Sequence, residues 1–333
     1  MRLGFTLLHC VYTDASKLWW WVISLKYNRL IRQAVLIALV EIACPGALAE
    51  SLSIRLVVSD DNAFSRETAN RLQILIEQSV PGIALERVTA TAAASAAAPP
   101  ALVRLVVTVG DAAWQSAASS PKDSPILAVM PQSRAYETMI KRSPRNSAAI
   151  FVEQPVGRIF NLVSLLKPGD AEVGVVLGAA TQEMAPLLQA AANERNQRLL
   201  LETASEGAAV GRVLADVIRG GANVLVAIPD PVVQTANTVQ PILLMSYHAG
   251  IPVIGYSAAY QRAGAMVSLY STPEQLARQV SEAVIAWTQG KGLSAIQEPK
   301  YFTVGINTTV ARSLGIELPD ADTLEQKLRS MKE

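Results

Sequence analysis

Short apolar runs alternate with amphipathic stretches from about residue 53 to the end of the chain. Within most runs the apolar residues do not alternate with polar ones, which indicates strands that are buried on both faces. Turn-forming residues follow the runs, and the stretches between them have the apolar spacing of helices. The pattern predicts strands at 54–58, 83–88, 103–109, 126–130, 148–152, 173–177, 199–202, 224–228, 251–255 and 302–306.

The order of these elements divides the chain into two similar arrays. Strands that alternate with helices favour parallel sheets, because a parallel pair needs a long crossover connection. The fold class that we predict is α/β, with two doubly wound parallel-sheet lobes joined by a hinge. We expect the chain to cross between the lobes near 152–155 and 256–259, and strand 302–306 to return to the second lobe. The predicted lobes are 50–154 with 258–298, and 155–257 with 299–333.

The first 49 residues have the order of a secretory signal peptide. Basic residues at positions 26, 29 and 32 precede an apolar run at 34–43, and the small-x-small sequence Ala-Leu-Ala ends at Ala49. We therefore expect export to the periplasm, with cleavage between Ala49 and Glu50.

Both cysteines of the chain, Cys10 and Cys44, lie inside this leader. A chain that begins at Glu50 has no thiol for a disulfide, a metal or a nucleophile, which suits an oxidising compartment. A lipoprotein anchored through Cys44 is the alternative. It is less favoured because Glu41 lies three positions before the cysteine, where an aliphatic residue is normal.

Composition removes several classes of function. The formal net charge is +1, and acidic residues slightly outnumber basic ones after the leader, so no basic stripe points to nucleic acid. The sequence has no phosphate-binding loop and no dinucleotide fingerprint, and His248 is its one histidine after the leader. That histidine follows a predicted helix, where it suits the C-terminal dipole. We therefore predict no catalytic residues, no metal and no cofactor.

One segment, 255–259, has the strand-to-helix position of a hydrolase nucleophile, with Ser257 at its centre. Its fifth residue is not glycine, and the histidine precedes the serine instead of following it. A helix-capping or ligand-contacting serine is therefore the better interpretation, and the chain is predicted not to be an enzyme.

Several segments of the second half follow one another in the order found in a known family. Together they resemble the ABC transporter substrate-binding family that includes tryptophan- and tyrosine-binding members, and the resemblance extends from about 148 to 319. It implies the type I periplasmic-binding-protein fold. Relatives tend to have Thr-Asp-Asn where this chain has Pro-Asp-Pro at 229–231, so the fold transfers better than the specificity. The segments are NVLVAIPD at 223–230, AGIPVIG at 249–255, RAGAMVS at 262–268, QLARQV at 275–280, FTVGIN at 302–307 and ARSLGIELP at 311–319.

The candidate ligand-binding residues share one position, the carboxyl end of a predicted strand. Ligands of open parallel sheets bind beyond these ends, and two facing lobes would line a cleft with them. For any one position, a turn or cap residue is the alternative. The candidates are Ser59, Asp60, Asn62, Gly110, Asp111, Gln132, Gly178, Asp230, Tyr256 and Ser257.

We therefore predict the periplasmic solute-binding component of an ABC importer, which binds a small polar or aromatic solute. Its expected partners are the solute and an ABC permease in the inner membrane, with no nucleic acid, and the protein is expected to be a monomer. A periplasmic sensory or regulatory receptor of the same fold, without transport, is the alternative, and the two share the same pocket chemistry. A DNA-binding repressor of this fold would need a helix-turn-helix where this chain has its leader.

The first testable prediction concerns the leader. Periplasmic protein should have the intact mass of a chain that begins at Glu50, because the Ala-Leu-Ala sequence is a cleavage site. Mass spectrometry of the exported protein measures this directly. A mature mass that retains Trp19–Trp21 would contradict the prediction.

Overall fold

The computed structural model describes residues 53–59, 62–95, 104–118, 124–142 and 146–333. The expected leader at 1–49, with Cys10 and Cys44, lies outside the described residues, and so does Asp60. Within the described part, no helix is both long enough and apolar enough to cross a membrane.

The first sheet has six strands, all paired in parallel. Its order is β2-β1-β3-β4-β5-β11. The chain places β2 on one side of β1 and then adds β3, β4, β5 and β11 successively on the other side. The strands are β1 (Ser53–Val58), β2 (Ala84–Thr89), β3 (Leu105–Val109), β4 (Ile126–Val129), β5 (Ser147–Ile150) and β11 (Ile296–Gln297).

The second sheet repeats this order as β7-β6-β8-β9-β10-β12. Its last strand is antiparallel, and the other five are parallel. The predicted α/β class, with two doubly wound sheets, is therefore confirmed. The strands are β6 (Glu172–Gly178), β7 (Arg198–Ala204), β8 (Val224–Val226), β9 (Val253–Gly255), β10 (Val267–Tyr270) and β12 (Thr303–Ile306).

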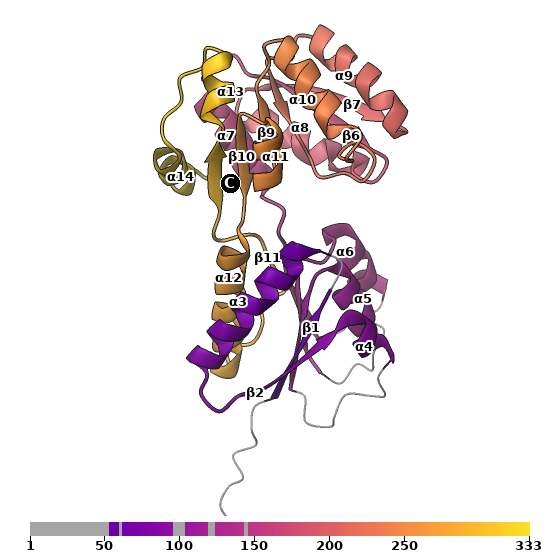
Figure 1. The fold of residues 1–333 in the computed structure, drawn as a ribbon, viewed down its shortest axis with the longest axis vertical. Coiled ribbons are helices and arrows are strands. Elements are labelled where there is room, and N and C mark those ends of the chain that lie inside the picture. The colour runs from indigo at the N-terminus through magenta and orange to yellow at the C-terminus, as the bar shows by residue number, and fades with distance from the viewer. Residues whose placement is uncertain (1–52, 60–61, 96–103, 119–123, 143–145) are drawn as a thin grey trace, which may run out of the picture. The chain divides into compact units, whose positions relative to one another are not determined.

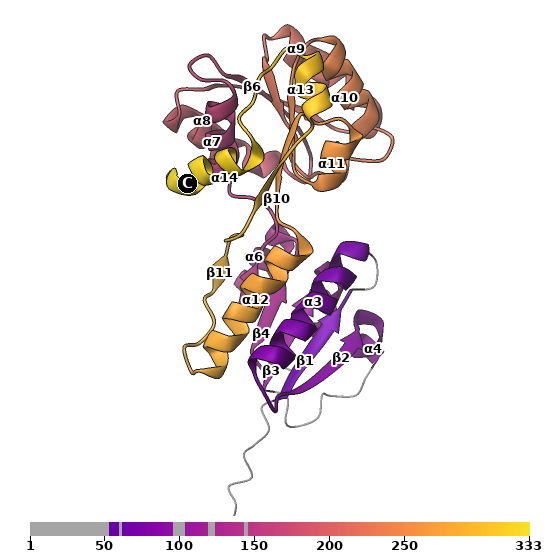
Figure 2. The ribbon, with the colours of Figure 1, turned by 60° about the vertical axis from the view of Figure 1, so that its left-hand side comes forward.

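Helices cover both faces of the first sheet, which is why its central strands are apolar throughout. Figure 2 shows α3 (Ala63–Ser79) and α12 (Pro273–Thr288) side by side on one face. The other face is covered by α4 (Ala90–Ser95), α5 (Asp111–Ala118) and α6 (Ser133–Arg142). In its core Tyr136 contacts Trp114 with the rings tilted and Phe151 edge to face.

Helices cover both faces of the second sheet in the same way (Figure 1). Each face has its own apolar core. One face packs against α7 (Val156–Leu166), α8 (Ala185–Glu194), α13 (Thr308–Ser313) and α14 (Ala321–Ser330). The other packs against α9 (Val210–Arg219), α10 (Val239–His248) and α11 (Ala258–Ala263). Two short 3-10 turns, η2 (Gln182–Met184) and η3 (Gly207–Ala209), precede α8 and α9.

Strand pairing corrects the expected second crossing near 256–259. Strand β10 pairs with β9 and β12, and α11 packs on the same sheet, so residues 258–270 belong to the second lobe. The chain leaves that sheet only after Tyr270, because the apolar run before it is a paired strand. The late strand β12 does return to the second sheet, as expected. The remaining lobe boundaries stay a proposal.

Helix α12 begins directly after this crossing with a reciprocal cap. The Gln275 backbone N–H donates to the Thr272 hydroxyl at 3.2 Å, and the Thr272 N–H donates to the Gln275 side-chain oxygen at 2.9 Å. Two amides that the helix itself leaves unpaired are thereby satisfied.

The second testable prediction concerns this cap. Thr272→Ala should lower the free energy of unfolding by about 1 kcal/mol, because one first-turn amide loses its acceptor. Thr288→Ala is the control, since that hydroxyl bonds only to the Ile285 carbonyl in the last turn. Denaturant titration measures the free energy of unfolding of both variants. An equal loss in the two would contradict a stabilising role of the cap.

Candidate functional site

Each sheet has one point at which the strand order reverses, between β1 and β3 in the first sheet and between β6 and β8 in the second. In open parallel sheets ligands bind beyond the strand ends at such a point. Ser59 and Gly110 follow β1 and β3, whereas Gly178 ends β6 and Asp230 follows β8. Four candidate residues therefore do lie at the two switch points.

At the first switch point the Ser59 hydroxyl is bonded within the protein itself. Ser59 is fully buried, and its hydroxyl accepts a hydrogen bond from the Ala113 N–H at 2.9 Å. Gly110 has a φ of 95°, and a Cβ at this position would lie 2.6 Å from the Ser59 Oγ. A glycine is thus required both by the left-handed backbone and by the close approach. Ser59 and Gly110 therefore pack against each other and form the closed floor of this switch point.

Asp230 has the same role at the second switch point. Its side chain is 4% exposed, and its two oxygens accept hydrogen bonds from four donors. The backbone N–H groups of Val232 and Val233 donate to Oδ1 at 2.7 and 2.9 Å. The Gly178 N–H and the Thr181 hydroxyl donate to Oδ2 at 3.2 and 2.8 Å. The carboxylate therefore joins the loop after β6 to the turn after β8.

Two further candidates are helix caps. The Asn62 side-chain oxygen accepts from the Ser65 N–H at 2.7 Å at the start of α3. The Ser257 hydroxyl accepts from the Tyr260 N–H at 3.1 Å at the start of α11. These are the local roles that polar residues before a helix usually have.

Asp111 and Gln132 are brought together at the edge of the first sheet. The Gln132 backbone N–H donates to Asp111 Oδ1 at 3.0 Å, which ties the end of β4 to the start of α5. Met130 directly follows β4 and has a φ of 55°. Such a backbone is uncommon outside glycine and concentrates at functional sites. Sequence reasoning did not single out Met130, because backbone strain has no composition signal.

Glu153 is a further acidic residue at this edge that sequence reasoning missed. It follows β5, and its carboxylate accepts from the Val152 N–H at 3.2 Å. Although the side chain is exposed, the surrounding protein desolvates its carboxyl and raises its pKa. Backbone hydrogen bonds oppose this rise, and the Asp111 carboxylate adds to it. The signal available in the sequence was its place directly after strand 148–152.

Tyr256 presents an aromatic ring at the carboxyl end of β9. The ring packs on that of Tyr260 with the centroids 5.1 Å apart, and partial burial raises the pKa of the Tyr256 hydroxyl. Tyr256 is only partly buried, so one part of it is accessible to a ligand. A tyrosine in this position offers both a flat apolar surface and a hydroxyl.

One ion pair links the carboxyl edges of the two sheets. Arg134, at the start of α6, donates to the Ala180 carbonyl at 3.0 Å and to the Glu183 carboxylate at 2.5 Å. The partners of Arg134 lie in the loop and the 3-10 turn that follow β6. Both side chains are well exposed, so the pair contributes little to stability.

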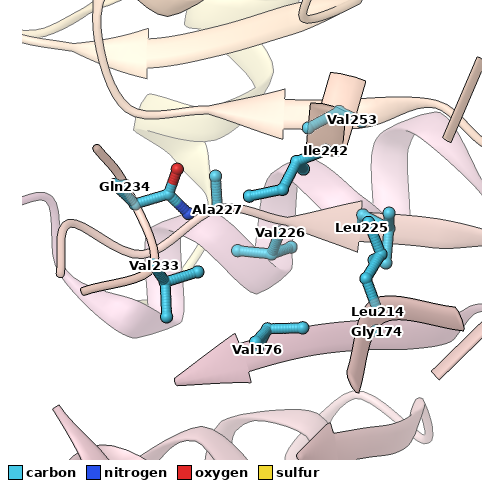
Figure 3. Close-up of a pocket in the computed structure, with 10 residues that line it drawn as sticks. All are labelled: Gly174, Val176, Leu214, Leu225, Val226, Ala227, Val233, Gln234, Ile242 and Val253. Atoms are coloured by element: carbon cyan, nitrogen blue, oxygen red, sulfur yellow. The ribbon is translucent and has the colours of Figure 1, made fainter. Parts of the chain in front are cut away.

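A pocket within the second lobe lies beside β8 and the turn that follows it (Figure 3). Its cavity volume is only about 20 Å³, and all but one of its side chains are apolar. Figure 3 shows the Gln234 carboxamide as its one polar group. With so little polar chemistry, it is a weaker candidate than the strand ends. It is lined by Gly174, Val176, Leu214, Leu225, Val226, Ala227, Val233, Gln234, Ile242 and Val253.

Comparison with known proteins identifies the fold. No family model matches the chain, and no curated protein matches it in sequence. Among solved structures, it is similar to a ligand-free, open substrate-binding protein with adhesive properties from Clostridium difficile (TM-score 0.65, 15% identity, covering 81% of this chain and 96% of that one).

Two further structures are similar. One is an ABC domain in complex with L-Trp from Streptococcus pneumonia (TM-score 0.59, 14% identity, 83% and 98% covered). The other is a conserved domain protein from Vibrio cholerae (TM-score 0.57, 19% identity, 83% and 98% covered). At these identities the likeness is one of fold, and the fold is that of type I periplasmic binding proteins, which ABC solute-binding proteins share.

The third testable prediction concerns Glu153. Its raised pKa means that the folded state holds the proton more tightly than the unfolded state, so stability is lost as pH rises through the Glu153 titration. Glu153→Gln removes this loss and should be more stable than the wild type at pH 7, by about 0.5 kcal/mol because the exposed side chain is screened. The gain should vanish below the usual glutamate pKa.

Thermal unfolding at several pH values measures this difference. The control is Glu317→Gln, which changes an exposed glutamate in the loop after α13. A gain that is the same at low and neutral pH would contradict the prediction.

Proposed function

We propose that the protein is the solute-binding component of an ABC importer, and that it closes around a small solute held between the carboxyl ends of its two sheets. The observation that carries the proposal is the repeated strand order, which gives each lobe a polar carboxyl edge at its switch point. The Arg134 contacts with the loop after β6 support it, because they join one such edge to the other. Solved structures of similar fold include a substrate-binding protein and an ABC domain in complex with L-Trp.

The polar groups at the two edges indicate what kind of solute this would be. The first edge carries the Asp111 and Glu153 carboxylates, and the carboxyl of Glu153 is partly desolvated. A cationic nitrogen in the solute would stabilise both carboxylates, since a protonated amine donates to carboxylates in charge-assisted hydrogen bonds. The second edge carries the Tyr256 ring, which suits an apolar or aromatic group. A small amine with an apolar part, such as an amino acid, fits both edges.

Within this proposal, Ser59, Gly110, Gly178 and Asp230 form the floor of the site, whose groups are held by the chain itself. Asn62 and Ser257 cap helices beside it. Asp111, Gln132, Glu153 and Tyr256 are the direct ligand contacts, with Asp60 as an expected further one. Delivery to an inner-membrane permease, location in the periplasm and a monomeric state belong to the same proposal.

The fourth testable prediction concerns ligand class. In a thermal-shift screen of amino acids, sugars, nucleosides and small anions, amino acids should raise the unfolding temperature most. A ligand present at 100 times its Kd stabilises the folded state by about 2.7 kcal/mol. The best compound should then bind Tyr256→Ala and Asp111→Asn roughly ten- to a hundredfold more weakly in calorimetric titration.

Tyr247→Ala is the control for this experiment, because Tyr247 is an exposed tyrosine on α10. It should bind like the wild type. Stabilisation by sugars or anions alone would contradict the proposed ligand class. Wild-type affinity in both site variants would contradict the proposed site.

A further inference from the structure

Between β5 and β12 the chain passes from one sheet to the other three times. The first crossing, 151–155, follows β5 and leads to α7. The second, 271–272, follows β10 and leads to α12. The third, 298–302, follows β11 and leads to β12. Any rotation of one lobe against the other must be absorbed by the backbone of these three segments.

Backbone pairing leaves a gap in the middle of the crossings. The ladder of the first sheet ends where the Phe151 N–H donates to the Gln297 carbonyl at 3.0 Å. The ladder of the second sheet begins where Tyr270 pairs with Thr303. Between these points the bonds from one crossing to another are made by side chains.

Ser271 is the central group of this gap. Its hydroxyl accepts from the Gln154 side-chain nitrogen at 3.0 Å and donates to the Tyr301 carbonyl at 2.7 Å. One buried hydroxyl, 3% exposed, thus joins the second crossing to both the first and the third.

Arg158, on the first turn of α7, closes the connection. One guanidinium nitrogen donates to the Gln154 side-chain oxygen at 2.7 Å and to the Pro299 carbonyl at 2.9 Å. The guanidinium also lies 4.3 Å from the centre of the Phe302 ring, and it is paired with the Glu333 carboxylate at 2.6 Å. Arg158 is 5% exposed, so a buried charge is held by two crossings and the C-terminal residue together.

We propose that Gln154, Ser271 and Arg158 are positioning residues of the hinge, which lock the three crossings into one joint. Because these side chains bond to one another and to the Tyr301 and Pro299 carbonyls, independent twisting of one crossing would break a hydrogen bond of the network. The crossings therefore bend together, and the lobes rotate about one axis. The effect on ligand affinity rests on the proposed function, whereas the effect on lobe motion does not.

Spin-label distance measurements on the free protein test the lobe motion. In the full chain, Cys10 and Cys44 are replaced by serine, and labels are attached at Gln78→Cys on α3 and Ala190→Cys on α8, both exposed. Ser271→Ala should broaden the distance distribution about twofold, since removing the hydroxyl frees both neighbouring crossings. Gln154→Ala should do the same, and Ser271→Thr, which keeps the hydroxyl, should restore the narrow distribution.

Ser246→Ala is the matched control. Ser246 is also a fully buried serine, but its hydroxyl bonds only to the Ile242 carbonyl within α10. It should lower the unfolding temperature about as much as Ser271→Ala while leaving the distance distribution unchanged. A broadened distribution in Ser246→Ala, or an unchanged one in both hinge variants, overturns the proposal.

A second readout uses the amino acid that gives the largest thermal shift. Ser271→Ala should weaken its binding roughly fivefold, mainly through faster dissociation, because a loose hinge no longer brings the two edges into register. Unchanged affinity with a broadened distance distribution would overturn only the link to binding. If no compound binds, the distance measurement still decides the hinge proposal, and the failure belongs to the proposed function.

Discussion

Strands that are buried on both faces and paired in parallel are the constraint on which this structure depends. Parallel pairing brings the carboxyl ends of six strands to one edge of the first sheet and those of five strands to one edge of the second. Helices must then cover both faces of each sheet. Apart from the outer surfaces of the helices, polar side chains can therefore gather only at the strand ends and in the loops beyond them. The position of the candidate site follows from this constraint more than from any single residue.

The polar groups at these edges divide into two kinds. Ser59 and Asp230 are buried and have their hydrogen bonds satisfied by backbone amides of the neighbouring loops. Each packs against a glycine that has no room for a side chain, Gly110 or Gly178. They hold the loops in place, whereas Asp111, Glu153 and Tyr256 remain accessible beside them. A rigid floor of this kind keeps the accessible groups in a fixed geometry, which lowers the entropy lost when a ligand binds.

The three crossings have a different physical problem, because a hinge must move without exposing its buried polar groups. Here the Arg158 charge is buried, yet its donors are shared among Gln154, the Pro299 carbonyl and Glu333. Removing one partner of a buried charge is strongly destabilising, so such a network keeps its connections while the backbone around it bends. The hydrogen bonds of this network therefore favour one mode of lobe motion and do not fix a single conformation.

The hydrophobic pattern by itself determined the fold class, the existence of nearly every strand and the polar character of the strand ends, because periodicity and burial are properties of neighbouring residues. It also placed Ser257 correctly at a helix start. Only the tertiary structure decided that β10 stays in the second sheet, since pairing depends on residues far apart in the chain. The same holds for the four donors around Asp230, the desolvation of Glu153 and the bonds of Ser271 to two other crossings. Each of these arises where separate segments meet, and no local pattern in the sequence encodes which segments those are.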